Sequence, residues 1–190
     1  MEGKIPIDKL QIYKGRPEDE QDRPAKEIRT YDFLDHLGIE YYRIDHAPAT
    51  GDDLSLLAAI EESLDARICN NLLLANRQRT RFYMLMLPSD KRFRSSEVSK
   101  QAGSSRLHFA EPEYMEELID CTPGSASIMG LINDRDRRVQ LLVDEDILRS
   151  EYVGCHPCIN TSSLRIRSKD LFETFLQAAE HDYIAVHCGA

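Results

Sequence analysis

The segment RICNNLLLANRQRTRFYMLML, residues 67–87, contains two apolar runs joined by a short polar connection. RICNNLLLA and RFYMLML have the apolar and aromatic composition of strands, and NRQR between them is typical of a turn. We therefore expect a hairpin here. Because helices and strands alternate along the rest of the chain, an inserted hairpin favours a mixed α/β sheet over a doubly wound parallel sheet.

Helix signals lie on both sides of this hairpin. Pro24 suits the first position of a helix that continues to Gly38, and Asp52 or Asp53 can cap a helix that begins at Leu54. Apolar spacing predicts three more helices, over residues 95–102, 111–119 and 169–180.

Further strands and the domain limits follow from the same patterns. SASIMGLI and RVQLLVD, residues 125–132 and 138–144, predict a second hairpin across NDRDR. A chain of 190 residues is long enough for one well-buried domain, so we expect a polar N-terminal arm over residues 1–23 and one domain over residues 24–190. The remaining predicted strands cover residues 39–44, 106–110, 152–154, 162–167 and 183–186.

The composition is that of an ordinary soluble globular protein, with 42% hydrophobic and 30% charged residues. The longest apolar run, MLMLP, is far too short to span a membrane, and the N-terminal MEGKIPIDKL lacks the apolar core of a signal peptide. The five cysteines are an odd number at uneven spacing, so they do not indicate a disulfide framework. These features predict a protein of the reducing cytoplasm with no membrane partner.

The net charge of −9 argues against a protein that coats nucleic acid, but this charge is unevenly distributed. Residues 77–106 carry 8 basic and 2 acidic side chains, whereas the segments on both sides are acidic. Such a basic segment could attract a phosphate backbone locally while the rest of the surface repels it. The alternative is a solvated strand-and-turn surface with no ligand.

The CHPC stretch at residues 155–158 raises three alternatives. A redox dithiol needs its first cysteine at a helix N-terminus, which stabilises the thiolate, but the residues after Cys158 have the pattern of a turn and a strand. A structural zinc site needs four ligands, and only the HC pair at residues 187–188 offers a second pair. Burial of both cysteines as small apolar residues is therefore favoured, with no bound metal.

GCHPCINTSS, residues 154–163, resembles the G-x-H-P-x-x-N-T element of the YbaK/prolyl-tRNA-synthetase-associated domain superfamily, whose editing domains hydrolyse mischarged aminoacyl-tRNA. Other segments resemble this family in the right order. IEYYRIDHAPAT is similar to its early strand and H-x-P-x-x-T, and residues 68–87 are similar to its K-N-L-F-L strand and hairpin. TPGSASIMGLIND is similar to its T-P-G-S-V-x-P loop, and VQLLVDEDIL to the strand and helix before the final motif. The resemblance covers about residues 25–180, with the layout of the freestanding prolyl-tRNA editing proteins.

The resemblance implies a single domain with a curved mixed sheet flanked by helices. It also implies an aminoacyl-tRNA deacylase that acts in trans, with Ala-tRNA(Pro) as the favoured substrate. The expected partners are the acceptor end of the tRNA and, in addition, prolyl-tRNA synthetase, without a cofactor or a metal; the oligomeric state is left open. A second hypothesis is a tRNA-binding or regulatory protein of the same fold with weak or no deacylase activity.

The matched motifs also imply a site. An ester carbonyl gains negative charge during hydrolysis, so backbone N–H donors within the 123–126 loop, at the residues after Pro123, could form an oxyanion site. A water aided by the ribose hydroxyl would attack. His156 would position the substrate rather than act as an obligate base. The residues expected to take part in catalysis are Asn70, Gly124, Ser125 and His156. Those expected to bind the substrate are His46, Thr50, Asn71, Ala126, Ser127, Ile128, Pro157 and Asn160.

The chain departs from the family pattern at two of these positions. Asn70 stands where the family has the lysine of K-N-L-F-L, and Ile128 replaces the loop proline. A lysine would give a charge-assisted contact of about 1.5–3 kcal/mol, against about 0.5–1.5 kcal/mol for a neutral hydrogen bond. Loss of the proline should loosen the loop at a cost of about 1 kcal/mol. We therefore expect the fold to be kept and the deacylase activity to be weakened.

Overall fold

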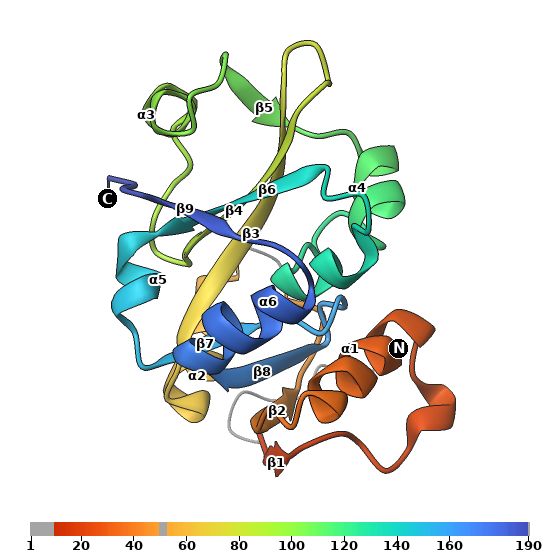
Figure 1. Ribbon diagram of the computed structural model, residues 1–190. Coiled ribbons are helices and arrows are strands. Elements are labelled where there is room, and N and C mark those ends of the chain that lie inside the picture. The colour runs from red at the N-terminus through yellow and green to blue at the C-terminus, as the bar shows by residue number, and fades with distance from the viewer. Residues whose placement is uncertain (1–9, 50–52, 190) are drawn as a thin grey trace.

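The computed structural model describes residues 10–49 and 53–189 (Figure 1). Within these residues, nine strands form one sheet in the order β1-β2-β8-β7-β3-β4-β6-β9, and β5 pairs with β3. The strands are β1 (Ile12–Lys14), β2 (Tyr41–Asp45), β3 (Arg67–Asn76), β4 (Phe82–Pro88), β5 (Leu107–Phe109), β6 (Val139–Asp144), β7 (Tyr152–Cys155), β8 (Ser162–Arg167) and β9 (Tyr183–Val186).

The sheet is mixed, as the hairpin in residues 67–87 predicts. β3 and β4 form that antiparallel hairpin, whereas β3–β7, β4–β6 and β6–β9 are parallel pairs. The expected fold class, one α/β domain with a mixed sheet flanked by helices, is confirmed. The predictions for Thr50, Asp52 and residues 1–9 lie outside the described residues.

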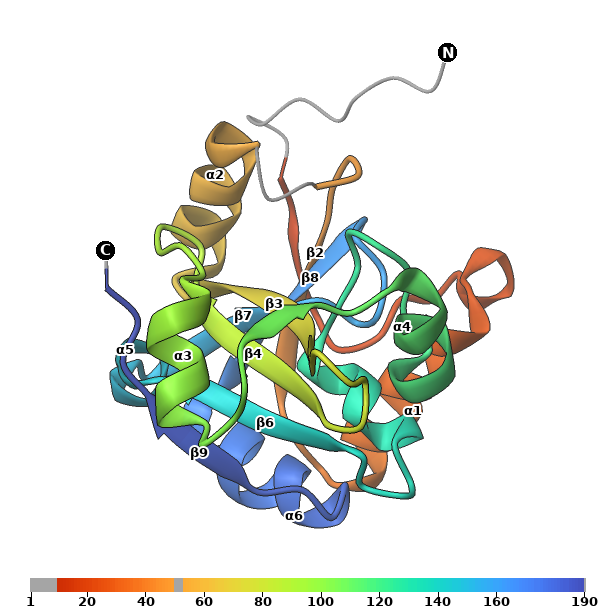
Figure 2. The same ribbon diagram turned by 90° about the horizontal axis from the view of Figure 1, so that it is seen from above.

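Helices cover both faces of the sheet (Figures 1 and 2). On one face, α1, α4, η3 and η4 pack into the largest core cluster; on the other, α2 and α3 each cover a smaller cluster. No helix in the described ranges has the length and apolarity needed to cross a bilayer. The helices are η2 (Glu20–Asp22), α1 (Ala25–His36), α2 (Leu54–Leu64), α3 (Ser95–Gln101), α4 (Pro112–Ile119), η3 (Ile128–Asn133), α5 (Glu145–Arg149), η4 (Asp170–Phe175) and α6 (Leu176–Ala178).

One predicted element is wrong. Residues 125–132 do not form a strand that pairs with β6; most of this segment is the 3₁₀ helix η3, and β6 lies in parallel between β4 and β9. Ser127 caps η3 because its hydroxyl accepts a hydrogen bond from the N–H of Met129 at 3.1 Å. Gly130 packs so closely on α4 that a Cβ there would lie 2.6 Å from the carbonyl oxygen of Ile119. This close packing on a helix overrides the strand-like composition of the segment.

The residues before α1 belong to the fold from residue 10 onwards. β1 pairs with β2 and forms an edge of the sheet. Arg23 then ties this segment to the body of the domain through ion pairs of 2.9 Å with both Glu27 and Asp45. The predicted arm over residues 1–23 therefore contributes a strand and partly buried ion pairs in its described part.

β3 has an uncovered stretch in the middle of the sheet. On one edge of β3, the pairing with β7 ends at Ile68. On the same edge, the pairing with β5 begins only at Leu74. Among the described strands, β4 is therefore the only one in register with residues 69–73. Since the carbonyl of Leu73 faces this edge and accepts a hydrogen bond from Ala110, the main-chain N–H and C=O of Asn71 point into the same gap.

Candidate functional site

A cleft of about 1080 Å³ follows the uncovered edge of β3. Residues 69–73 of β3 line its floor, the start of α2 lines one side, and the segment after β4, residues 89–93, lines another. The cleft runs from His156, just after β7, to Phe109 at the end of β5. A gap in strand pairing thus creates a large concave site in the described part of the chain, of the kind that binds small ligands.

Five of the predicted site residues line this cleft. They come from three segments that are far apart in sequence: β3, the loop before η3 and the residue after β7. The five residues are Asn70, Asn71, Gly124, Ala126 and His156.

The loop at residues 122–125 is a tight turn in the wall of the cleft, which Pro123 and Gly124 line together with the following Ala126. The N–H of Ser125 donates to the carbonyl oxygen of Thr122 at 2.9 Å, and Gly124 has a φ of +85°. Pro123 followed by a glycine with positive φ is the sequence that a type II turn requires. The N–H of Ser125 is used inside the turn, whereas the N–H groups of Gly124 and Ala126 have no hydrogen-bond partner within the described residues and are left for a ligand.

Two predicted serines support the loop from behind the cleft wall. Ser125 is buried, and its hydroxyl donates to the carbonyl of Thr122 at 2.9 Å. Ser127 is fully buried, and its hydroxyl donates to the carbonyl oxygen of His156. Neither hydroxyl lines the cleft. Both serines instead fix the position of the turn, and Ser127 ties that turn to the histidine.

The other predicted binding residues also lie behind the wall. The Asn160 side-chain amide donates to the carbonyl of Ala49 at 3.3 Å and so joins the two segments around His156. His46 is buried, with its Nε2 2.9 Å from the Ser163 hydroxyl. Pro157 is buried behind His156, and Ile128, the second departure from the family pattern, is fully buried in the largest core cluster.

Asn70 and Asn71 on β3 offer different hydrogen-bonding groups to a ligand. The Asn70 side-chain amide donates to the carbonyl oxygen of Ser89 at 3.5 Å, a weak contact that leaves the group available to a ligand. The Oδ1 of Asn71 is buried and has no hydrogen-bond partner within the described residues. A buried acceptor without a partner is costly, so this atom favours a ligand that donates a hydrogen bond.

His156 is neutral near pH 7. Burial, and then the neighbouring His46 ring with its centroid 6.3 Å away, lower the pKa of His156 to about 4. Burial also lowers the pKa of His46. A neutral imidazole can orient a water or a substrate hydroxyl, but it does not provide a positive charge.

The lowered pKa of His156 predicts how the free energy of unfolding depends on pH. The neutral ring favours the folded state above the unfolded pKa of about 6.5, and this contribution is lost as the pH falls toward about 4. We expect His156→Gln to flatten the dependence of unfolding free energy on pH by about 2–3 kcal/mol between pH 7 and pH 4, measured by urea unfolding.

His181→Gln is the matched control for that experiment. Although burial opposes it, a hydrogen bond to Asp134 raises the pKa of His181, so its contribution is present at low pH and is lost as the pH rises. The two variants should therefore change the pH profile in opposite directions. Equal profiles for His156→Gln and the wild type would contradict the neutral state of the half-buried His156.

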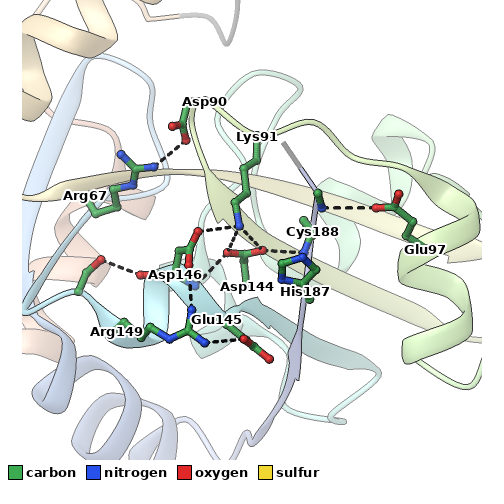
Figure 3. A network of polar contacts seen from close by, with 12 residues as sticks. Arg67, Asp90, Lys91, Glu97, Asp144, Glu145, Asp146, Arg149, His187 and Cys188 are labelled. Atoms are coloured by element: carbon green, nitrogen blue, oxygen red, sulfur yellow. Dashed lines mark hydrogen bonds and ion pairs between the residues drawn. The ribbon is translucent and has the colours of Figure 1, made fainter.

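Two cations of the basic segment line the cleft, Lys91 and Arg92. The ammonium group of Lys91 is held by the buried Asp144 at 2.9 Å and by Asp146 at 2.8 Å (Figure 3). Asp144 also accepts a hydrogen bond from the main-chain N–H of Cys188 at 2.9 Å. Lys91 thereby anchors the cleft wall to β6, α5 and the C-terminal segment.

Arg92 differs from its neighbour because it is exposed and has no carboxylate partner within the described residues. Arg67, which comes just before Asn70 in sequence, does not line the cleft; it pairs with Glu61 at 3.2 Å and with Asp90 at 2.7 Å. Arg92 is therefore the cation in the cleft that is available to a phosphate group.

The thiols of the CHPC stretch are core groups. All five cysteines are buried and free. Burial raises the pKa of Cys155, whereas hydrogen bonding to Cys121, followed by that to Thr30, lowers the pKa of Cys158. No three His, Cys, Asp or Glu side chains in the described part of the chain are arranged to hold a metal ion. An inaccessible first cysteine with a raised pKa is the opposite of an activated thiolate.

The geometry agrees with a family comparison. A model of the aminoacyl-tRNA editing domain matches residues 50–174, which is more than half of the chain. The chain belongs to the aminoacyl-tRNA editing domain family. The matched range contains β3, the 122–125 turn and His156, so all lining residues of the cleft except Ala49 lie within the matched editing domain.

Several proteins similar to this chain are named for prolyl-tRNA editing or for prolyl-tRNA synthetase. The prolyl-tRNA editing protein ProX of Acetoanaerobium sticklandii is 25% identical over 154 residues, which cover 80% of this chain and 92% of that protein. The prolyl-tRNA synthetase associated domain-containing protein 1 of Danio rerio is 25% identical over 152 residues, which cover 79% of this chain and 80% of that protein. A crystal structure of a candidate trans-editing enzyme for prolyl-tRNA synthetase has a TM-score of 0.65 at 15% identity, covering 89% of this chain and 99% of that one, and so supports the fold.

Some residues of the editing cleft were not singled out from the sequence. The sequence marks Arg92 only as part of the basic segment, and no motif marks Phe93 or Phe109. Phe109 reaches the cleft because β5 pairs with the end of β3, a long-range contact that local spacing does not reveal.

Proposed function

We propose that this editing-domain protein acts in trans as a deacylase of mischarged tRNA and that Ala-tRNA(Pro) is its substrate. The observation that carries the proposal is the meeting of the Gly124 turn and the neutral His156 at one end of a cleft, within a domain of the editing family. The relatives named for prolyl-tRNA editing support the choice of tRNA. The tRNA acceptor end and prolyl-tRNA synthetase are the proposed partners, and the cytoplasm is the proposed location.

In this mechanism the backbone provides the electrostatic stabilisation. The ester carbonyl oxygen lies against the N–H groups of Gly124 and Ala126, where negative charge develops when water attacks. The neutral His156 orients the water or the adjacent ribose hydroxyl. The free Oδ1 of Asn71 accepts a hydrogen bond from the substrate's ammonium group or a hydroxyl. Water is the nucleophile, so neither Cys155 nor Cys158 takes part.

A second candidate, a tRNA-binding protein of this fold with little or no hydrolysis, is favoured by Asn70. An amide at this position provides no positive charge, whereas the family pattern has a lysine. The other departure, Ile128, carries less weight because this side chain is buried away from the cleft.

Comparison of Ala-tRNA(Pro) with Pro-tRNA(Pro) tests the proposed substrate. We expect faster hydrolysis of the alanyl ester, because a pocket that fits alanine excludes the larger prolyl group by size. Both substrates should be assayed with the same tRNA under single-turnover conditions. Equal hydrolysis of the two would contradict alanine specificity, and binding of both without hydrolysis would favour the second candidate.

The Asn70 departure gives a prediction of its own. Asn70→Lys should raise kcat/KM on Ala-tRNA(Pro), by about tenfold for every 1.4 kcal/mol of contact regained. One added cation should change the slope of the salt dependence by about one unit at most. Gln78→Lys, which adds the same charge in the exposed β3–β4 turn outside the cleft, is the matched control and should leave kcat/KM unchanged. A loss of activity in Asn70→Lys would show that Asn70 belongs to a retuned site.

A further inference from the structure

Two phenylalanines form an exposed aromatic corner at the end of the cleft that lies away from His156. Phe109 is 64% exposed although it belongs to a strand, and Phe93 is half-buried. Their ring centroids are 5.6 Å apart and their planes are inclined by 72°. Both rings line the cleft. Leu107 already anchors β5 in the core, so the exposed ring of Phe109 is not needed to hold this strand.

The spacing along β3 sets the distance of this corner from His156. Phe109 lies opposite Leu74, and continuation of the β3–β7 register by two residues puts His156 beside Asn70. Four residues of strand correspond to about 13 Å. In an aminoacyl-tRNA the ester and the base of the last nucleotide lie on opposite sides of one ribose, so a single terminal nucleotide can reach from the histidine end of the cleft to the rings.

The charge around the rings also suits a nucleotide. Arg92, the cleft cation without a carboxylate partner in the described part of the chain, is adjacent to Phe93 in sequence. Lys91, held by Asp144 and Asp146, fixes the main chain that carries both residues. A cation for the phosphate beside an aromatic surface for the base is the combination with which proteins bind single-stranded nucleic acid.

We propose that Phe93 and Phe109 form a stacking platform for the base of the 3′-terminal nucleotide of the tRNA and that Arg92 contacts its phosphate. The inference rests on the proposed function, which brings an aminoacyl-tRNA into the cleft. It assigns the histidine end of the cleft to the aminoacyl ester and the aromatic end to the terminal nucleotide. The cleft volume of about 1080 Å³, much more than an alanyl group fills, leaves room for both.

Binding of an uncharged RNA hairpin tests the platform without any hydrolysis. The probe is an acceptor-stem hairpin with an unpaired 3′ end and 2-aminopurine as its last base, whose fluorescence falls when the base stacks. The wild type should bind it with quenching. Phe109→Ala should abolish the quenching and weaken binding about 5- to 100-fold, the effect of losing one stacked base, whereas Phe109→Tyr should keep both.

Two controls separate stacking from general damage. Tyr183→Ala removes an exposed ring from a similar aromatic pair, that with Phe172 at 5.5 Å, which lies outside the cleft; this variant should bind as the wild type does. A hairpin whose last nucleotide lacks its base should bind wild type and Phe109→Ala equally weakly. Three results would each overturn the platform: fluorescence quenching that survives in Phe109→Ala, no binding of the hairpin by the wild type, or an equal loss of affinity in Phe109→Ala for the hairpins with and without the last base.

The outcomes also distinguish this inference from the proposed function. Quenching that depends on Phe109, in a protein that does not hydrolyse Ala-tRNA(Pro), would leave the platform standing and remove the deacylase. Hydrolysis at the same kcat/KM in Phe109→Ala and in the wild type would leave the deacylase standing and remove the platform.

Discussion

Replacement of Gly124 with valine is expected to lower kcat/KM for deacylation by about 100- to 1000-fold, the loss that follows removal of one oxyanion donor. Gly124 has a φ of +85°, which a β-branched residue adopts only with strain. The nearest atom to an added Cβ, the Nδ2 of Asn160, lies 3.9 Å away, so the side chain itself has room. The backbone would instead leave the positive φ and rotate the N–H groups of Gly124 and Ala126 away from the position proposed for the ester carbonyl oxygen.

Gly38→Val is the matched control for this change. Gly38 has a φ of +66°, no atom within 4 Å of its added Cβ, and a place outside the cleft. Both variants should lose about 1–2 kcal/mol in urea unfolding, the cost of a left-handed residue, but only Gly124→Val should lose activity. Retention of the wild-type rate within threefold in Gly124→Val would contradict the assignment of this turn as the oxyanion site.

The largest stability effect is expected at Lys91. Lys91→Met should lower the free energy of unfolding by about 3–5 kcal/mol, because it leaves the fully buried Asp144 carboxylate without its cation. The main-chain N–H groups of Asp146 and Cys188 still donate to this carboxylate, at 3.0 and 2.9 Å, and limit the loss (Figure 3). Chemical denaturation of the purified variant gives this value directly.

Arg149→Ala tests whether burial is the cause. Arg149 pairs with Glu145 at 2.7 Å and with Asp146 at 3.1 Å in the same region, but its side chain is 69% exposed, so its removal should cost less than about 1 kcal/mol. A double variant, Lys91→Met with Asp144→Leu, should recover part of the stability because no buried charge remains. A loss below 1 kcal/mol in Lys91→Met alone would contradict the anchoring role of this pair.

Elements with strong local signals were predictable from the sequence. α2 begins where the Asp53 cap predicts, and the β3–β4 hairpin follows the two apolar runs at residues 67–87. η3 was not predictable as a helix because its structure depends on the contact between Gly130 and α4, which no local pattern records. The gap between β7 and β5 along β3, which forms the cleft, depends likewise on long-range pairing.

The site was predictable to the extent that its motifs lie on the cleft. Gly124 and His156 meet there as the resemblance implies, but the sequence could not distinguish lining residues from supporting ones. Ser125 and Ser127 have the right spacing, yet their hydroxyls point into the fold and hold the turn. The role of Phe109 depends on which strand β5 joins, so it could be found only from the three-dimensional arrangement.

Single-turnover hydrolysis of Ala-tRNA(Pro) by the wild type, beside the Gly124→Val and the Cys155→Ser/Cys158→Ser variants, tests the central claim most directly. We expect the wild type to release alanine faster than the spontaneous reaction. The serine variant should match the wild type, and Gly124→Val should fall close to the uncatalysed rate. Hydrolysis that is absent from the wild type, or that is lost with the two thiols and kept in Gly124→Val, would contradict the account.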